Sequence, residues 1–177
     1  MGADAFADLV AADDGPMVVV TTAVGGERAG CLVGFHSQSS IDPERYSVWL
    51  SKANHTYRVA TRADHLAVHF LTDADHPIAE LFGGSSGDDV DKFERTATEP
   101  GPDGVPLLAD CPHRLVGRRV TLFDDGGDHV CVTLEVLSAT TPGPFDPLRL
   151  SDVADLTPGH DAEERPHPPT ERADPDA

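Results

Sequence analysis

The chain is poor in long apolar runs, in cysteine and in lysine. No apolar run approaches the about 20 residues that a helix needs to cross a bilayer, and the run at residues 17–20 has only the length of a strand. The first residues also lack the basic start and apolar stretch of a secretory signal. We therefore expect a cytoplasmic protein without a membrane-spanning segment.

The three cysteines are Cys31, Cys111 and Cys131, which form neither a CxxC pair nor a zinc-binding spacing. Each lies in an apolar or strand-like context, so we expect all three to be buried as small hydrophobic residues. His65 and His69 have the i, i+4 spacing that a helix uses to bind a metal ion. Their segment alternates as a strand, in which four positions span about 13 Å. We therefore expect no metal site.

Positive charge is scarce, because 31 acidic residues face 13 basic ones and the net charge is −18. Such a surface repels phosphate backbones and anionic lipid headgroups over a Debye length of about 8 Å. We expect no nucleic-acid or membrane partner. Lys52 and Lys92 are the only lysines beside 11 arginines. Each is a candidate anion ligand, with plain solvent-exposed decoration as the alternative.

The length of 177 residues suits one domain with a tail. We assign the domain to residues 1–158 and an acidic, proline-rich tail to residues 159–177. From residue 160 on, the tail has no periodic apolar pattern, which predicts disorder. Just before it, residues 145–150 predict one last strand and residues 153–156 a short turn against the domain.

Hydrophobic periodicity predicts about six strands and two or three short helices. The strands are expected at residues 17–24, 29–35, 45–51, 66–70, 118–123 and 129–137. The helices are expected at residues 3–13, after an N-cap at Asn54, and from residue 75 on. This pattern is typical of a mainly β fold, a small barrel with helical insertions, and not of a doubly wound sheet. No GxGxxG follows a strand, so a Rossmann dinucleotide site has no support.

Two polar stretches in the first third of the chain lie where strands end and sites are usually built. In residues 31–43, Gly34 allows close backbone approach to a ligand, and the hydroxyl groups that follow can donate hydrogen bonds. The alternative is a serine-rich loop. Ser51, Lys52 and Asn54 lie at a helix N-terminus, where free N–H groups and a positive charge favour a phosphate. Here the alternative is simple capping by Asn54.

Two further stretches lie later in the chain. Residues 81–93 carry Lys92 in a segment too long for a turn, with a flexible acidic surface loop as the alternative. His129 follows Gly127 and Asp128 at a strand start, where it can donate a hydrogen bond to a cofactor or bind a substrate anion. Exposed polar surface is the alternative for this histidine.

Taken in order, these motifs resemble the flavin reductase-like family over roughly residues 15–140. The most specific are Asp91-Lys92-Phe93 and Gly127-Asp128-His129. The resemblance implies an FMN-binding split β-barrel, Greek-key-like with short helical insertions. It also implies a homodimer that uses NADH or NADPH to reduce FMN, or FAD, for a partner monooxygenase. One departure is that residues 32–36 read Leu-Val-Gly-Phe-His, where many members carry Thr and Ser, which leaves backbone N–H groups as the donors there.

The resemblance also implies residue roles. The flavin ring would face Val33, Gly34, Phe35, His36 and Ser37, and the ribityl chain and phosphate would contact Ser51, Lys52, Asn54 and Thr56. Phe82, Lys92 and Phe93 would close the remaining side, with Lys92 balancing phosphate charge. His129 would lie beside the nicotinamide or the flavin as the catalytic-site residue, positioning the rings, since hydride transfer between cofactors requires no acid or base.

Two rival hypotheses come from other functional classes. One is a split barrel that binds flavin, haem or a deazaflavin without turnover. The other is a structural or partner-binding barrel whose acidic tail is the interaction element. Flavin absorbance of the purified protein would exclude the second rival, and NAD(P)H consumption that requires added flavin would separate a reductase from a silent binder.

Overall fold

The architecture is one curved antiparallel sheet with the strand order β2-β1-β5-β8-β9-β4-β3. The structure is a computed structural model and describes residues 3–87 and 90–159. The strands of the sheet are β1 (Val18–Val24), β2 (Glu27–Val33), β3 (His36–Ser40), β4 (Arg45–Ser51), β5 (His65–Phe70), β8 (Arg114–Phe123) and β9 (His129–Thr140). A mainly β fold, as the alternation predicts, is therefore confirmed.

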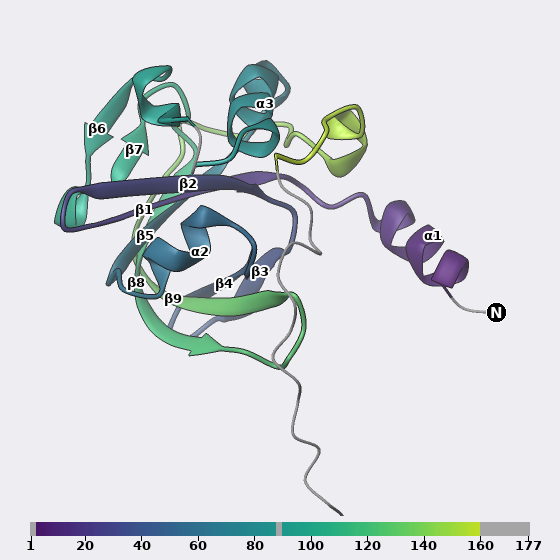
Figure 1. The fold of residues 1–177 in the computed structure, drawn as a ribbon, viewed down its shortest axis with the longest axis horizontal. Coiled ribbons are helices and arrows are strands. Elements are labelled where there is room, and N and C mark those ends of the chain that lie inside the picture. The colour runs from purple at the N-terminus through teal and green to yellow at the C-terminus, as the bar shows by residue number, and fades with distance from the viewer. Residues whose placement is uncertain (1–2, 88–89, 160–177) are drawn as a thin grey trace, which may run out of the picture.

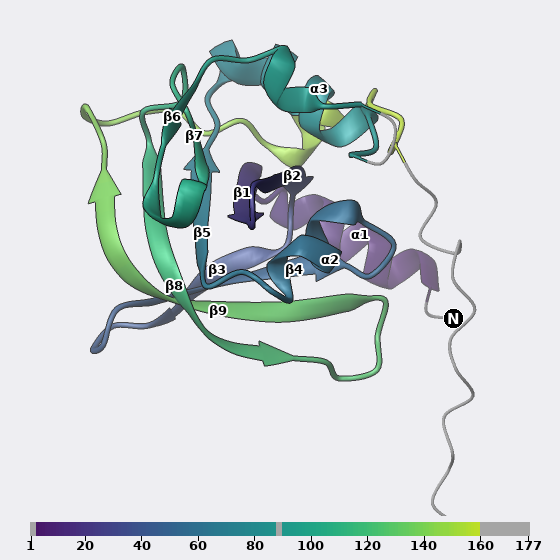
Figure 2. The same cartoon turned by 60° about the vertical axis from the view of Figure 1, so that its left-hand side comes forward.

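A two-residue link forces this sheet to roll up. β2 and β3 are the two edges of the sheet, yet only Gly34 and Phe35 separate them in the chain. So short a link can join opposite edges only if the sheet curves until they meet, which is how the ribbon runs in Figures 1 and 2. The two edges are connected through Gly34 and Phe35 but do not pair with each other, which leaves the barrel open there.

Besides the sheet, the described residues form three α-helices and a small hairpin. They are α1 (Ala3–Asp13), α2 (His55–Ala60), α3 (His76–Gly84) and the pair β6 (Thr98–Pro100) and β7 (Pro106–Leu108). α2 begins where expected, because Asn54 Oδ1 accepts a hydrogen bond from the Thr56 amide at 3.0 Å. No helix within the described ranges is both long enough and apolar enough to cross a membrane.

Two cores fill the two faces of β1. Val18 and Val20 point into the barrel with Leu50, Leu66 and Leu134. Val19 points to the other face, where α3 and the segments around it pack; that second core contains Met17, Leu71, Ala79, Phe82, Phe93, Leu108, Cys111, Leu148 and Val153. This explains why β1 reads as a continuous apolar run, and β9 as a strand with alternate buried positions.

The sequence interpretation was wrong in four places. The serine-rich segment after Phe35 is a strand, β3, and β6 and β7 form a hairpin that no pattern indicated. Residues 145–150 form only isolated bridges, Pro16 with Arg149 and Thr72 with Pro147. Cys31 and Cys111 are buried, but Cys131 is only partly so, because it lies on the face of β9 opposite Val130 and Val132. The predicted disorder of residues 160–177 falls outside the described residues.

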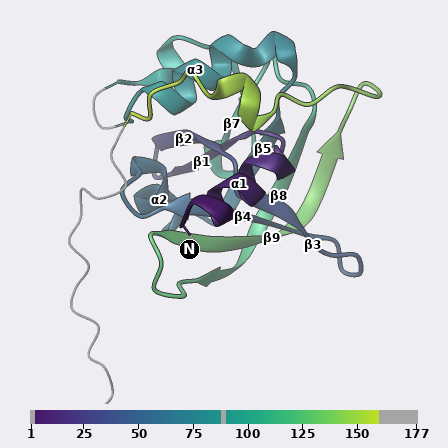
Figure 3. The same ribbon diagram turned by 90° about the vertical axis from the view of Figure 1, so that its right-hand side faces the viewer.

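Helix α1 stands apart from the sheet in Figure 1, and in the turned view of Figure 3 it lies in front of the strands. Phe6 and Leu9 are 70% and 72% exposed. The base of the helix is nevertheless fixed, since both carboxylate oxygens of Asp14 accept hydrogen bonds from Ser151, one from its amide at 2.8 Å and one from its hydroxyl at 2.9 Å. These bonds lower the pKa of Asp14 below its usual value. The direction of α1 is thus set by the rest of the chain.

Candidate functional site

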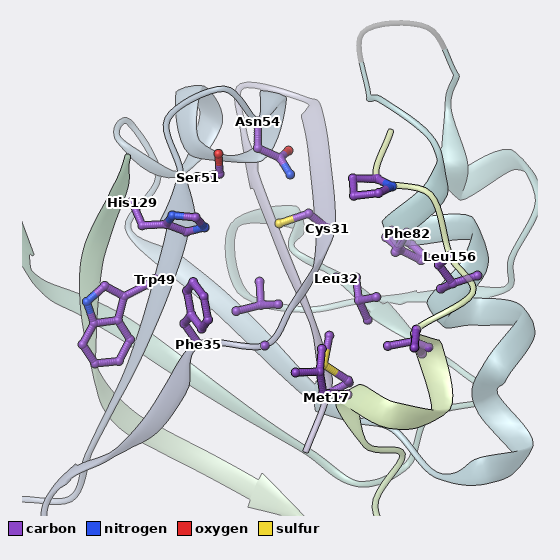
Figure 4. Close-up of a pocket in the computed structure, with 17 residues that line it drawn as sticks. Met17, Cys31, Leu32, Phe35, Trp49, Ser51, Asn54, Phe82, His129 and Leu156 are labelled. Atoms are coloured by element: carbon purple, nitrogen blue, oxygen red, sulfur yellow. The ribbon is translucent and has the colours of Figure 1, made fainter. Parts of the chain in front are cut away.

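A cavity of about 470 Å³ lies where the two edges of the sheet part. Figure 4 shows its lining side chains in three groups: an aromatic wall, a polar end and an aliphatic wall. Seven residues predicted for the site line it: Val33, Gly34, Phe35, Ser51, Asn54, Phe82 and His129. They come from β2, its link to β3, β4, the N-cap of α2, α3 and β9. Residues spread over nearly one hundred positions thus meet at one place.

The link between β2 and β3 offers backbone donors. Within the described chain, the amide N–H groups of Gly34 and Phe35 donate no hydrogen bond, while the Phe35 carbonyl accepts one from the Trp49 amide at 2.9 Å. Gly34 is exposed and has no side chain to shield these groups. An acceptor atom of a ligand in the cavity can therefore approach them, which is the compensation expected for the missing Thr and Ser hydroxyls.

The aromatic wall consists of Phe35, Trp49 and His129. The rings of Phe35 and His129 meet edge to face, with their centroids 5.1 Å apart. His129 Nδ1 lies 2.9 Å from Asp128 Oδ1 and donates to it, which fixes the tautomer of the neutral ring. Nε2 of His129 is then a hydrogen-bond acceptor in the neutral ring and a donor in the charged one.

The polar end is formed by Ser51 and Asn54, which lie together at the top of Figure 4. Asn54 uses Oδ1 as the helix cap, so its amide nitrogen remains as a donor. Lys52 does not line the cavity; its Nζ donates to Asp124 Oδ1 at 2.8 Å, and the side chain stays partly exposed. Lys52 lies between two lining residues in the sequence, and its charge is paired with the Asp124 carboxylate.

The aliphatic wall comes from a segment that follows the barrel. Its lining residues are Leu150, Val153, Ala154, Leu156 and Pro158. In Figure 4 Leu156 lies on the side of the cavity away from Phe35 and His129. This segment begins as a 3₁₀ turn (Leu150–Val153). Its end is tied to α3, because the Gly159 amide donates to the Gly83 carbonyl at 3.0 Å.

His36 and Ser37 lie outside the cavity wall. The His36 ring is held by two hydrogen bonds of 2.7 Å, one from the Tyr46 hydroxyl to Nδ1 and one from Nε2 to the Pro16 carbonyl. Burial lowers the pKa of His36 and raises that of Tyr46 to about 12. Ser37 is exposed and donates to the Gln38 carbonyl. His36 thus joins β3 to the start of β1 as a structural residue.

Thr56, Lys92 and Phe93 are buried behind the cavity wall. Lys92 is 3% exposed, and its Nζ donates to the Gly30 carbonyl at 3.1 Å and to the Phe82 carbonyl at 3.0 Å. Phe93 packs against Phe82 with ring centroids 5.6 Å apart. The structure therefore places Lys92 away from the polar end, where a phosphate partner was expected.

Several lining residues escaped the sequence interpretation. These are Met17, Cys31, Leu32, Trp49, Gly83 and the five residues of the aliphatic wall. Nothing in the local pattern distinguishes them from ordinary core or loop residues. Their position depends on the rolling of the sheet, which brings distant segments together. Among them, only Trp49 could have been recognised from the sequence, because it is the single tryptophan of the chain and lies on the same predicted strand as Ser51.

These residues fit a flavin by their chemistry. A flat ring system needs apolar and aromatic walls with a few donors at its heteroatoms, and a ribityl phosphate needs a polar end. The cavity supplies the two walls, the unpaired N–H groups of Gly34 and Phe35, and the Ser51 and Asn54 side chains. Comparison with known proteins agrees with this fit, since the Flavin reductase like domain matches residues 14–152. The chain belongs to the flavin reductase-like family.

Two curated relatives show how similar this flavin reductase-like chain is to known proteins. It is 28% identical over 138 residues to the FMN reductase (NADH) RutF of Methylorubrum extorquens, covering 76% of this chain and 64% of the relative. It is 26% identical over 130 residues to the stachydrine N-demethylase reductase subunit Stc3 of Rhizobium meliloti, covering 70% and 54%. The chain thus spans less than two thirds of either relative.

The fold of the flavin reductase-like chain matches that of a flavin reductase domain protein from Arthrobacter sp. FB24. The TM-score is 0.74 at 19% identity, and the match covers 84% of this chain and 91% of the other. At this identity the likeness concerns the fold. The split-barrel architecture implied by the sequence motifs is therefore confirmed.

Proposed function

We propose that this protein is a flavin reductase that uses NADH or NADPH to reduce FMN, with FAD as the alternative flavin. The observation that carries the proposal is the cavity at the opening of the barrel, whose lining combines two residues with unpaired backbone N–H groups, apolar walls and a polar end. The family supports it, and one relative is named an NADH-dependent FMN reductase.

In this proposal the chain holds the flavin by three features. The amides of Gly34 and Phe35 donate hydrogen bonds to ring acceptors, and the aliphatic wall covers the ring opposite Phe35 and Trp49. Ser51 and Asn54 bind the ribityl phosphate, with Lys52 next to them as the positive charge. Thr56 and Phe93 act from behind, by ordering the Asn54 cap and the Phe82 ring.

A flavin held by Gly34, Ser51 and Asn54 would supply the hydride-accepting chemistry, and the protein would contribute orientation and a dry contact. His129 lies in the aromatic wall beside Phe35, where a nicotinamide can stack. With Nδ1 bonded to Asp128, the neutral ring offers Nε2 as an acceptor for a carboxamide or hydroxyl donor of the nucleotide. This supports a positioning role for His129.

The proposal extends to the partners and the setting of the reaction. We infer a homodimer that works in the cytoplasm and passes reduced flavin to a separate monooxygenase. One relative is named the reductase subunit of a demethylase, which supports a two-component arrangement. The strongly acidic chain supports the absence of nucleic-acid and membrane partners.

The decisive experiment adds flavin and nicotinamide to the purified chain. We expect NADH or NADPH to be consumed only when FMN or FAD is present, with FMN giving the higher kcat/KM. Oxidation of the nicotinamide is followed by absorbance in a matrix of both nucleotides and both flavins. Flavin binding without nucleotide consumption would favour the silent binder, and no binding of flavin would exclude the proposal.

Replacement of His129 tests its positioning role. We expect His129→Asn to lower turnover by about tenfold or less, because Asn keeps a polar group of similar reach. We expect His129→Ala to raise the apparent KM for the nicotinamide more strongly, with little change in flavin affinity. Complete loss of turnover in His129→Asn with intact binding would instead indicate proton donation. His76→Asn is a matched control, since His76 does not line this cavity.

A further inference from the structure

Lys92 is a buried cation with no described anionic partner. Its side chain is 3% exposed, and its Nζ hydrogen bonds go to two neutral carbonyls, those of Gly30 and Phe82. Asp91, the adjacent carboxylate, is committed elsewhere: Oδ1 accepts from the Phe93 amide at 2.9 Å and Oδ2 from Arg28 at 3.0 Å. Within the described residues, Lys92 therefore forms no ion pair, although unpaired buried charge is costly.

The surroundings of Lys92 still favour its charged form. The Phe82 carbonyl belongs to the last turn of α3, where the helix dipole attracts a cation and where α3 itself carries no basic residue. Nζ also lies 5.5 Å from the centroid of the Phe82 ring, on its face. Burial lowers the pKa of Lys92, because these neutral groups only partly replace the water that would solvate the ammonium group.

The position of this charge relative to the cavity is the important point. One of the two carbonyls belongs to Phe82, and the other belongs to the residue before Cys31; both Phe82 and Cys31 line the cavity. In Figure 4 Phe82 lies on the right beside Leu156, and Cys31 lies near the centre, below Asn54 at the top of the cavity. The Lys92 ammonium group therefore lies behind the part of the wall that Phe82 and Cys31 form, and its burial keeps water from screening its charge.

We propose that Lys92 makes this cavity select a flavin ring that bears negative charge, which is the reduced flavin deprotonated at N1, over the neutral oxidised ring. This inference rests on the proposed flavin binding and assigns Lys92 as a positioning and charge-selecting residue behind the wall. It differs from a phosphate contact, because the charged part of the ligand is the ring and not the ribityl phosphate.

Two substitutions separate charge from hydrogen bonding. Lys92→Gln keeps a donor for the carbonyls but removes the charge, while Lys92→Arg keeps both. Dissociation constants are measured anaerobically for riboflavin and FMN, each oxidised and chemically reduced. We expect the preference for reduced over oxidised flavin to fall about tenfold in Lys92→Gln and to stay near wild type in Lys92→Arg. The fall should be equal for riboflavin and FMN, since riboflavin lacks the phosphate.

Lys52→Gln is the matched control at the polar end. It should weaken FMN binding more than riboflavin binding and leave the reduced-to-oxidised preference unchanged. If Lys92→Gln changes FMN binding alone, Lys92 acts on the phosphate and the inference is overturned. An unchanged preference in Lys92→Gln also overturns it while leaving flavin reduction intact. If the wild type binds no flavin in either state, both the inference and the proposed function fail.

A measurement on the wild type decides the matter even if Lys92→Gln does not fold. At a pH just below the pKa of N1 in free reduced flavin, flavin bound to the protein should show the absorbance spectrum of the reduced anion. The spectrum of the neutral reduced form under these conditions would overturn the inference.

Discussion

Replacing Gly34 by Leu is expected to lower flavin affinity by about thirtyfold. A Cβ atom at this position would meet Met17 Sδ at 3.3 Å, so a longer side chain would grow toward a residue that lines the cavity. It would also displace a ligand from the two unpaired N–H groups, and each lost hydrogen bond is worth about 1 kcal/mol. Titration of flavin fluorescence measures the change.

The same variant should fold normally. Gly34 is exposed and its φ is not in the left-handed region, so we expect the free energy of unfolding to change by less than about 1 kcal/mol. Gly15→Leu is the matched control, because a Cβ atom there would meet nothing within 4 Å. Wild-type flavin affinity in Gly34→Leu would show that the ligand does not approach the link between β2 and β3.

Acidification should destabilise the protein through His69. This ring is fully buried; its Nε2 accepts from the Leu108 amide at 3.0 Å, and its Nδ1 donates to the Val19 carbonyl at 3.2 Å. A second proton can enter only at Nε2, where it would break the bond from Leu108. Burial accordingly lowers the pKa of His69 from 6.5 to about 4.

The direction of the effect follows from this lowered pKa. Above pH 6.5 the ring is neutral in both the folded and the unfolded chain, and stability is complete. Between pH 6.5 and about 4 only the unfolded chain takes up the proton, so stability is lost as the pH falls. The full loss from this one group amounts to about 3 kcal/mol.

The test compares three proteins by urea unfolding across this pH range. His69→Gln retains a polar group but cannot titrate, so its stability should fall less with acid than that of the wild type. His65→Gln is the control on the same strand, since His65 is partly exposed and bonds Asp103. Equal acid sensitivity in the wild type and His69→Gln would exclude His69 as the titrating group.

Local patterns predicted those parts of the fold that depend on nearest neighbours. The alternation of β9, the glycine turn after β1 and the Asn54 cap of α2 each follow from a few adjacent residues, and each is present. β3 was missed because Ser37 and Gln38 have low strand propensity, and only pairing with β4 makes them extended.

The candidate site likewise contains residues that local features predicted and residues that they did not. Residues at a strand end or a cap, such as Gly34, Ser51 and His129, reached the cavity because those local features point to one edge of the sheet. Lys92 did not, because its direction depends on the packing of Phe82 and Gly30, which adjacent residues do not reveal. The aliphatic wall depends on where the chain returns after β9, which no short motif encodes.

That wall serves the cavity and the second core at once. Val153, Ala154, Leu156 and Pro158 line the cavity but lie beyond residues 14–152, the part that the family shares. No strand of the sheet includes them, and a hydrogen bond from the Gly159 amide to the Gly83 carbonyl ties their far end to α3. Val153 belongs to the second core and Leu156 packs against it, so the same residues that close the cavity also cover that core. A ligand that presses this segment outward would therefore loosen the packing on α3 as well as the wall of the cavity.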